Sequence, residues 1–240
     1  MKNFIRIKNP VDKLNLENLS FDTLSLKARP ILTDEEVKIF ENFFARIPTT
    51  ATATQSENIQ KAKKNWMKKG VEFIYIGAES GSDEVLKNIE KGATRQEIIE
   101  AVKKIEKSGI KASVTFISGL GGKKHWKEHA VETGTMISEM GASYVGVLTL
   151  LLEESAPMYK DVLDGSFQLL SPEEVVLESL LMMENINVPE DKPCVFRSNH
   201  ASNYVTLRGD LPKDKGKFLK QLKKASENLN LLKDERFRAL

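Results

Sequence analysis

Apolar and polar positions fall into two alternating patterns from about residue 50 onward. Three runs are rich in β-branched and apolar residues, namely 71–77 (VEFIYIG), 110–119 (IKASVTFISG) and 142–152 (ASYVGVLTLLL). Near-continuous hydrophobicity of this kind is typical of strands that are buried on both faces of a parallel sheet. The pattern therefore predicts three such strands, and the threonine-rich run 48–54 predicts a further strand.

Helix boundary signals separate these strands. Residues 94–97 (TRQE) match a capping box, and residues 33–36 and 171–174 repeat the same start signal. Gly109 and Gly141 stand where a left-handed residue commonly ends a helix. Strands that alternate with helices through short connections pair in parallel with right-handed crossovers. The sequence therefore predicts an α/β fold built on a parallel sheet.

Composition and charge narrow the class of protein. The chain has 240 residues and no long flexible linker, which predicts one domain over 1–240. Its formal net charge of +2 creates no overall electrostatic field that would favour nucleic acid. The longest apolar stretch, 145–152, is far shorter than the roughly 20 residues that span a bilayer. The start, MKNFIRIKNP, lacks the features of a signal peptide, so we expect a cytoplasmic protein.

The lysine-rich segment 211–232 predicts an amphipathic helix near the C-terminus. Its apolar positions recur at helical spacing, and its lysines lie between them. A run of this kind is usually the solvated face of a helix. We therefore interpret these lysines as solvent-exposed rather than as a nucleic-acid patch.

Polar residues follow each of the three predicted strands. In parallel α/β folds the chemistry gathers at the carboxyl ends of the strands. Glu79 and Ser80 follow the first strand, and a carboxylate and a hydroxyl there can bind a ribose diol or an ammonium group. Gly119 and Gly121 follow the second strand, where glycines let the backbone pass close to a ligand. Thr149 ends the third strand.

A fourth polar segment, 194–204 (CVFRSNHASNY), begins with the only cysteine of the chain. We interpret that cysteine as a small buried hydrophobe, because no neighbouring residue supplies a base. Arg197, Asn199, His200 and Asn203 concentrate hydrogen-bonding groups in this segment. Two interpretations stay open: these side chains either tie down the closing segment of the fold or bind an anionic or amide substrate.

His125, Glu128 and His129 spell H-x-x-E-H, the spacing of the inverted zinc proteases. Two histidines four residues apart on a helix face one metal, and Glu128 would be the general base. That class of protease also needs a glutamate ligand on another helix and has a different fold. Zinc hydrolysis therefore stands as an alternative to a cofactor site at the neighbouring glycines.

Taken in order, four segments resemble the radical SAM superfamily, and more narrowly its proteins with a coproporphyrinogen-oxidase/Elongator-like radical SAM core. The matching segments are 75–122, 150–159, 167–175 and 194–215. The resemblance covers 70–222, with 1–69 matching weakly and 223–240 forming the end of the C-terminal helix. It implies a parallel (β/α) partial barrel of the TIM type that lacks its first strand.

The resemblance also implies roles for individual residues around S-adenosylmethionine. Glu79 and Ser80 fall on the motif that contacts the ribose and the amino-acid part of this cofactor. Residues on the two following strand ends fall beside the adenine: Ile117, Gly119, Gly121, Thr149 and Leu151. No role is implied for the segment 194–204, so a substrate site there is a hypothesis from the residues alone.

One departure from the family concerns the [4Fe–4S] cluster, which these enzymes hold through a CxxxCxxC loop after the first strand. Cluster irons need thiolate ligands, and this chain has one cysteine. We therefore expect a truncated chain, inactive in radical chemistry unless cysteines come from elsewhere. A nucleoside-binding or scaffold protein without catalysis is the alternative. An unpaired apolar edge in place of the first strand would favour a complementing chain or self-association.

Overall fold

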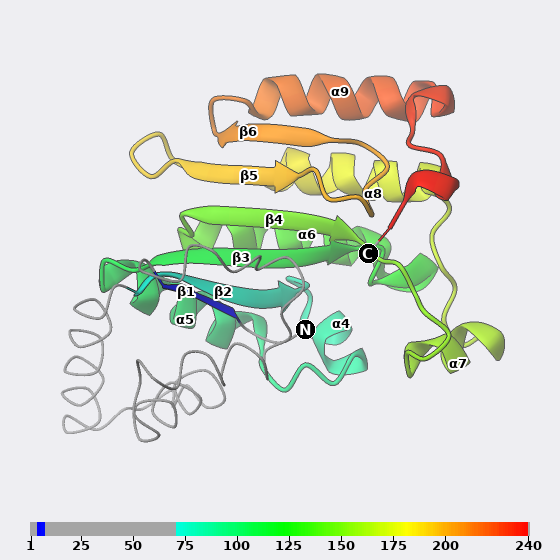
Figure 1. The fold of residues 1–240 in the computed structure, drawn as a ribbon, viewed down its shortest axis with the longest axis horizontal. Coiled ribbons are helices and arrows are strands. Elements are labelled where there is room, and N and C mark those ends of the chain that lie inside the picture. The colour runs from blue at the N-terminus through cyan, green and yellow to red at the C-terminus, as the bar shows by residue number, and fades with distance from the viewer. Residues whose placement is uncertain (1–3, 8–70, 240) are drawn as a thin grey trace.

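One six-stranded sheet organises the residues that the structure, a computed structural model, describes: 4–7 and 71–239 (Figure 1). The strands are neighbours in sequence order: β1 (Phe4–Ile7), β2 (Val71–Glu79), β3 (Lys111–Ser118), β4 (Tyr144–Thr149), β5 (Cys194–Ser198) and β6 (Leu207–Leu211). β2 to β5 run parallel, whereas β1 and β6 pair antiparallel at the two edges. The three predicted strands are confirmed, while the predicted run 48–54 lies outside the described residues.

Helices fill the connections between the parallel strands. They are α4 (Asp83–Asn88), α5 (Arg95–Lys107), α6 (Gly122–Met140), α7 (Met158–Leu163) and α8 (Pro172–Asn185). After β6 come α9 (Lys215–Glu227) and the short 3-10 helices Leu229–Leu231 and Glu235–Phe237. The capping boxes predicted at 94–97 and 171–174 are both formed. Gly141 ends α6 with φ 64°, and Gly109 follows α5 with φ 84°. The start signal predicted at 33–36 lies outside the described residues.

Helices α5, α6, α8 and α9 pack on one face of the sheet (Figure 1). On β3, Ala112, Val114 and Phe116 are fully buried against this layer, whereas the intervening Ser113 and Thr115 are half-buried. The hydrophobic pattern predicted burial on both faces, and it is complete only on the helix-covered face. A parallel sheet with helices on one face is the arrangement of a partial (β/α) barrel, so the predicted fold class is confirmed.

β1 forms the edge of the sheet beside β2. Its four residues pair with β2 antiparallel, with a register shift between Arg6 and Ile7. Short edge strands with irregular pairing limit the template that a sheet offers to other chains. The predicted association with a complementing chain or a second copy stays a prediction.

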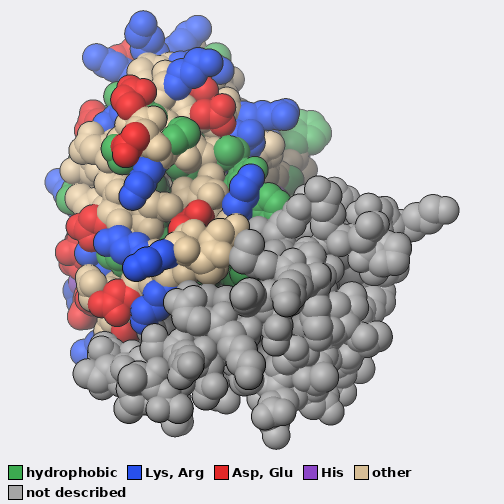
Figure 2. All heavy atoms as spheres, turned by 90° about the vertical axis from the view of Figure 1, so that its left-hand side faces the viewer, with side chains coloured by type: hydrophobic (Ala, Val, Ile, Leu, Met, Phe, Trp, Pro, Cys, Tyr) green, Lys and Arg blue, Asp and Glu red, His purple; other side chains and the backbone are tan. Residues whose placement is uncertain are grey.

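The amphipathic C-terminal helix is confirmed, but it ends earlier than the predicted segment 211–232. In α9, Phe218, Leu222 and Ala225 are buried, and the lysines between them are exposed. Lysines and acidic residues are interspersed over the surface that Figure 2 shows. The helix ends at Glu227, and the remaining residues fold back toward the sheet instead of continuing it.

Two further expectations can be checked against the described residues. Cys194 is buried, and this burial raises the pKa of its thiol to about 12, as suits a small buried hydrophobe. None of the helices within residues 71–239 has the length and apolar character needed to cross a bilayer.

Candidate functional site

The ends of β2, β3 and β4 meet at one edge of the sheet, where the sequence placed the candidate chemistry. Glu79 pairs in register with Phe116 of β3, and Ser118 pairs with Thr149 of β4. The chain stays paired just beyond the strands, because the Leu150 N–H donates to the Ser118 carbonyl at 2.9 Å. We call the ends of these three strands, with Glu79, Gly119 and Thr149, the strand-end site.

Glu79 stands at a break in the regular strand. Its φ is 70°, and the β2–β3 register shifts between Gly77 and Glu79. A left-handed conformation costs a non-glycine residue about 1–2 kcal/mol, so the surrounding structure must hold it there. The side chain is 4% exposed, and its Oε1 lies 3.3 Å from Lys91 Nζ. A buried carboxylate with a cation beside it ends β2.

Ser80 is fully buried, and its hydroxyl is bonded within the protein. Its Oγ lies 2.8 Å from Nδ1 of His129 and accepts the Ser82 N–H at 3.0 Å. His129 Nε2 lies 3.1 Å from the Ile117 carbonyl, which only accepts hydrogen bonds. Nε2 therefore carries the ring proton, and Nδ1 accepts the hydroxyl proton of Ser80. The Ser80 side chain holds the strand end in place rather than presenting a free hydroxyl to a ligand.

The histidine pair does not form a zinc site. Both ring nitrogens of the fully buried His129 are already bonded to the protein, and burial lowers its pKa to about 4. Glu128 accepts a hydrogen bond from the Ser82 hydroxyl, and its other oxygen lies 3.6 Å from His125 Nδ1. The H-x-x-E-H spacing serves contacts between α6 and the end of β2, so the zinc interpretation was wrong.

The glycine turn, residues 119–122, follows β3 and begins α6. Gly119 and Gly122 have φ of 86° and 54°, a region that favours glycine. Glu178 on α8 holds this turn, because its Oε2 accepts the Ser118 hydroxyl at 2.5 Å and the Gly119 N–H at 2.6 Å. The sequence analysis missed Glu178, whose signal was a carboxylate between the apolar runs 175–177 and 180–183.

Asn203 and Arg197 tie the closing segment to the sheet. Asn203 is 2% exposed, accepts the Thr149 hydroxyl at 3.0 Å and donates to the Val147 carbonyl at 2.9 Å. Arg197 donates through Nη1 to the backbone carbonyls of Phe196 on β5 and Gly209 on β6. Asn199 and His200 are exposed. Asn203 and Arg197 thus tie down the closing segment of the fold, the first of the two interpretations left open. A substrate role stays a hypothesis for Asn199 and His200.

The C-terminal tail also reaches the strand-end site, close to the end of β4 (Figure 1). Arg238 donates to the Leu150 carbonyl at 3.3 Å and to the Ser202 carbonyl at 2.7 Å. Its guanidinium lies 3.9 Å from the centre of the Tyr204 ring. Leu151, one residue beyond this anchor, is half-buried. The sequence offered no pattern that would have placed Arg238 here.

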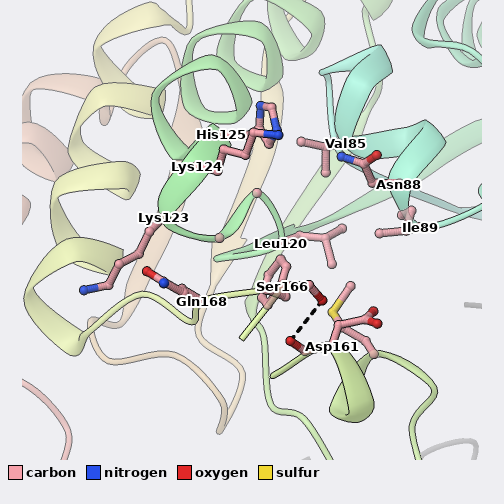
Figure 3. Close-up of a pocket in the computed structure, with 14 residues that line it drawn as sticks. Val85, Asn88, Ile89, Leu120, Lys123, Lys124, His125, Asp161, Ser166 and Gln168 are labelled. Atoms are coloured by element: carbon pink, nitrogen blue, oxygen red, sulfur yellow. Dashed lines mark hydrogen bonds between the residues drawn. The ribbon is translucent and has the colours of Figure 1, made fainter. Parts of the chain in front are cut away.

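A pocket of about 260 Å³ opens on the other side of the glycine turn, between α4, the start of α6 and the loop after α7 (Figure 3). Leu120, Asn88 and Gln168 line it, and the Ser166 hydroxyl donates to the Asp161 carbonyl at 3.2 Å. His125 Nε2 is buried in its wall without a hydrogen-bond partner in the described part of the chain. Glu79, Gly119 and Thr149 do not line this pocket, whereas Gly121, which the resemblance places beside the adenine, does.

Parts of this chain are similar to known proteins. The family described as Domain of unknown function (DUF4300) matches residues 1–79. A putative methylthiotransferase of Methanocaldococcus jannaschii is 32% identical over 71 residues, which are 30% of this chain and 15% of that protein. The solved structure of Methanocaldococcus infernus Elp3 with an N-terminal deletion aligns with a TM-score of 0.47 and 19% identity, over 71% of this chain and 39% of that one.

The similarity to the methylthiotransferase confirms the predicted relation to radical SAM proteins. This chain spans less than half the length of either relative. What the whole relatives do is therefore a separate question for this chain.

Proposed function

We propose that this chain binds S-adenosylmethionine at the strand-end site, as the cofactor-binding part of a radical SAM-type protein. The observation that supports the proposal is the meeting of Glu79, Gly119 and Thr149 at three adjacent parallel strand ends. Ligands of parallel α/β folds bind at this edge of the sheet. The relation to radical SAM proteins supports S-adenosylmethionine as the ligand.

The donor set suits the chemical parts of this cofactor. The Glu79 carboxylate would accept hydrogen bonds from the ribose hydroxyls or the ammonium group. Half-buried Ile117 and Leu151 offer apolar surface to the adenine, and Gly119 lets the backbone approach it closely. When bound, the cofactor supplies an activated sulfonium. Ser80 would act through the position of the strand end, because its hydroxyl already bonds His129.

The residues of this chain do not fit a [4Fe–4S] cluster. The cluster of a radical SAM enzyme needs three thiolates, and the 240 residues contain only Cys194. That thiol is buried on β5, and its pKa is raised to about 12, so it is a poor source of thiolate. We assign cofactor binding to this chain and derive no radical step from it. A complementing chain would have to bring the cluster ligands.

Isothermal titration calorimetry with S-adenosylmethionine tests the proposal. The wild-type chain should give saturable heat, and Glu79→Gln should bind about tenfold or more weakly, because a charge-assisted hydrogen bond contributes about 1.5–3 kcal/mol. Glu84→Gln is the matched control, since Glu84 is an exposed carboxylate on the adjacent helix. Thermal unfolding of both variants checks that they are folded. Absence of saturable heat from the wild type at millimolar cofactor would refute the proposal.

A further inference from the structure

Helix α6 contacts the exit of β2 at three successive residues of the turn 80–82. Ser80 bonds His129, the Gly81 N–H donates to Thr133 Oγ1 at 2.9 Å, and the Ser82 hydroxyl donates to Glu128. His129 and Thr133 are four positions apart and share one face of α6, and Glu128 precedes His129. Two residues of the motif that resembled a zinc site, Glu128 and His129, thus bond the turn.

The turn has no room to move against α6. A Cβ atom added at Gly81 would lie closer than 3.0 Å to the backbone carbonyl of Glu132. Only glycine permits this approach of the turn to the helix backbone. The position of the β2 end along the axis of α6 is therefore fixed by this contact.

His129 connects the turn 80–82 to the end of β3. Its Nδ1 accepts from Ser80, and its Nε2 donates to the Ile117 carbonyl, so one rigid ring joins two neighbouring strand ends. The ring is fully buried. Glu178 holds the next residues of β3 from the neighbouring helix, α8, through Ser118 and Gly119. Of the described side chains around the site, His129 alone bonds both the β2 end and the β3 end.

We propose that His129 is a positioning residue that sets the spacing between Glu79 at the end of β2 and Gly119 at the end of β3. The nature of the ligand placed by this spacing rests on the proposed function. The spacing itself rests on the hydrogen bonds of His129 to Ser80 and to Ile117, and on the close contact between Gly81 and the backbone of α6. A ligand that bridges the two strand ends binds tightly only if both are held at the productive distance.

The two nitrogens can be tested separately. His129→Asn places an amide near Nδ1 and retains the bond to Ser80, whereas His129→Gln reaches toward Nε2 and retains the bond to Ile117. His129→Leu removes both bonds at similar volume. Met140→Ala, at the far end of α6, is the control for loss of stability, because Met140 is fully buried and lies outside the site.

Two measurements on the full chain follow these variants: the Kd for S-adenosylmethionine and the hydrogen exchange of the Ser82 amide, which bonds Ser80 Oγ. We expect His129→Leu to weaken binding about tenfold or more, the Asn and Gln variants to recover part of this loss, and Met140→Ala to leave Kd unchanged. Ser82 exchange should rise in the Leu and Gln variants and stay slow in His129→Asn.

The outcomes separate the two proposals. If the wild type binds no cofactor, the proposed function fails, while Ser82 exchange still reports on the role of His129. If the Leu and Asn variants exchange Ser82 equally, or if Met140→Ala weakens binding as much as His129→Leu does, His129 is an ordinary core residue and the inference is wrong.

Discussion

Glu178 of α8 accepts a hydrogen bond from the Ser118 hydroxyl at the end of β3, at 2.5 Å, with both residues buried. The same oxygen accepts the Gly119 N–H, while Oε1 is buried without a hydrogen-bond partner in the described part of the chain. A carboxylate in such surroundings is poorly solvated, and burial raises its pKa to about 7. The turn that opens the proposed adenine site is therefore held by a group that titrates near neutral pH.

Glu178 should make the stability of the protein depend on pH. Its pKa is raised from 4.5 to about 7 on folding, so the folded state binds the proton more tightly than the unfolded state. The favourable contribution is complete below pH 4.5 and is lost as pH rises through 7. We expect the free energy of unfolding of the wild type, relative to Glu178→Gln, to fall by on the order of 3 kcal/mol between pH 4.5 and pH 8. Urea unfolding across this range measures the difference.

The comparison with Glu178→Gln is needed because His129 titrates in the opposite sense. Burial lowers the pKa of His129 from 6.5 to about 4, so its contribution is present above pH 6.5 and is lost as pH falls toward 4. His129 is unchanged in Glu178→Gln, and the difference between the two proteins removes its effect. Parallel stability curves for the wild type and Glu178→Gln would contradict the prediction.

Gly81→Ala should destabilise the protein and weaken cofactor binding together. The new methyl group would collide with the Glu132 backbone of α6, which cannot yield as a flexible side chain can. Overpacking of this kind costs typically about 1–3 kcal/mol. Thermal or urea unfolding gives the stability, and calorimetry gives the Kd.

Gly216→Ala provides the control for this substitution. Gly216 lies in α9 with nothing within 4 Å of an added Cβ, so alanine should stabilise the helix by up to about 1 kcal/mol. Equal effects of the two substitutions would show that α6 does not confine the turn.

Asn203→Ala should lower stability because it leaves two buried groups without partners. The Thr149 hydroxyl and the Val147 carbonyl would lose their hydrogen bonds, at about 1–3 kcal/mol for each buried group left unsatisfied. Asn199→Ala, at an exposed position of the same segment, should change the free energy of unfolding by less than about 0.5 kcal/mol. If both variants unfold at the wild-type urea midpoint, Asn203 does not anchor the segment.

The limits of the sequence interpretation are clearest at the two histidines of α6. Their spacing matched a zinc motif, and the same spacing equally suits a helix face that bonds a neighbouring turn. Local periodicity cannot distinguish these cases, because it states which residues share a face and not what that face meets. The interpretation of Asn203 and Arg197 stayed open for the same reason, until their partners on β4 and β6 were known.

The sequence by itself determined the local elements: strands in the runs 71–77, 110–119 and 142–152, and the helix starts at Thr94 and Ser171. Hydrophobic runs, capping boxes and glycines act over a few residues, so the information lies within each segment. It also placed the candidate chemistry at the strand ends, because parallel strands share their carboxyl edge.

Only the tertiary structure decided which side chains hold that edge together. Ser80 and His129 are 49 residues apart, Ser118 and Glu178 are 60 apart, and Thr149 and Asn203 are 54 apart. Each of these bonds joins a strand end to an element that packs against it only after the chain has folded. Burial then sets their chemistry, keeping His129 neutral and raising the pKa of Glu178 toward neutrality, because desolvation depends on the surroundings of a residue and not on its neighbours in sequence.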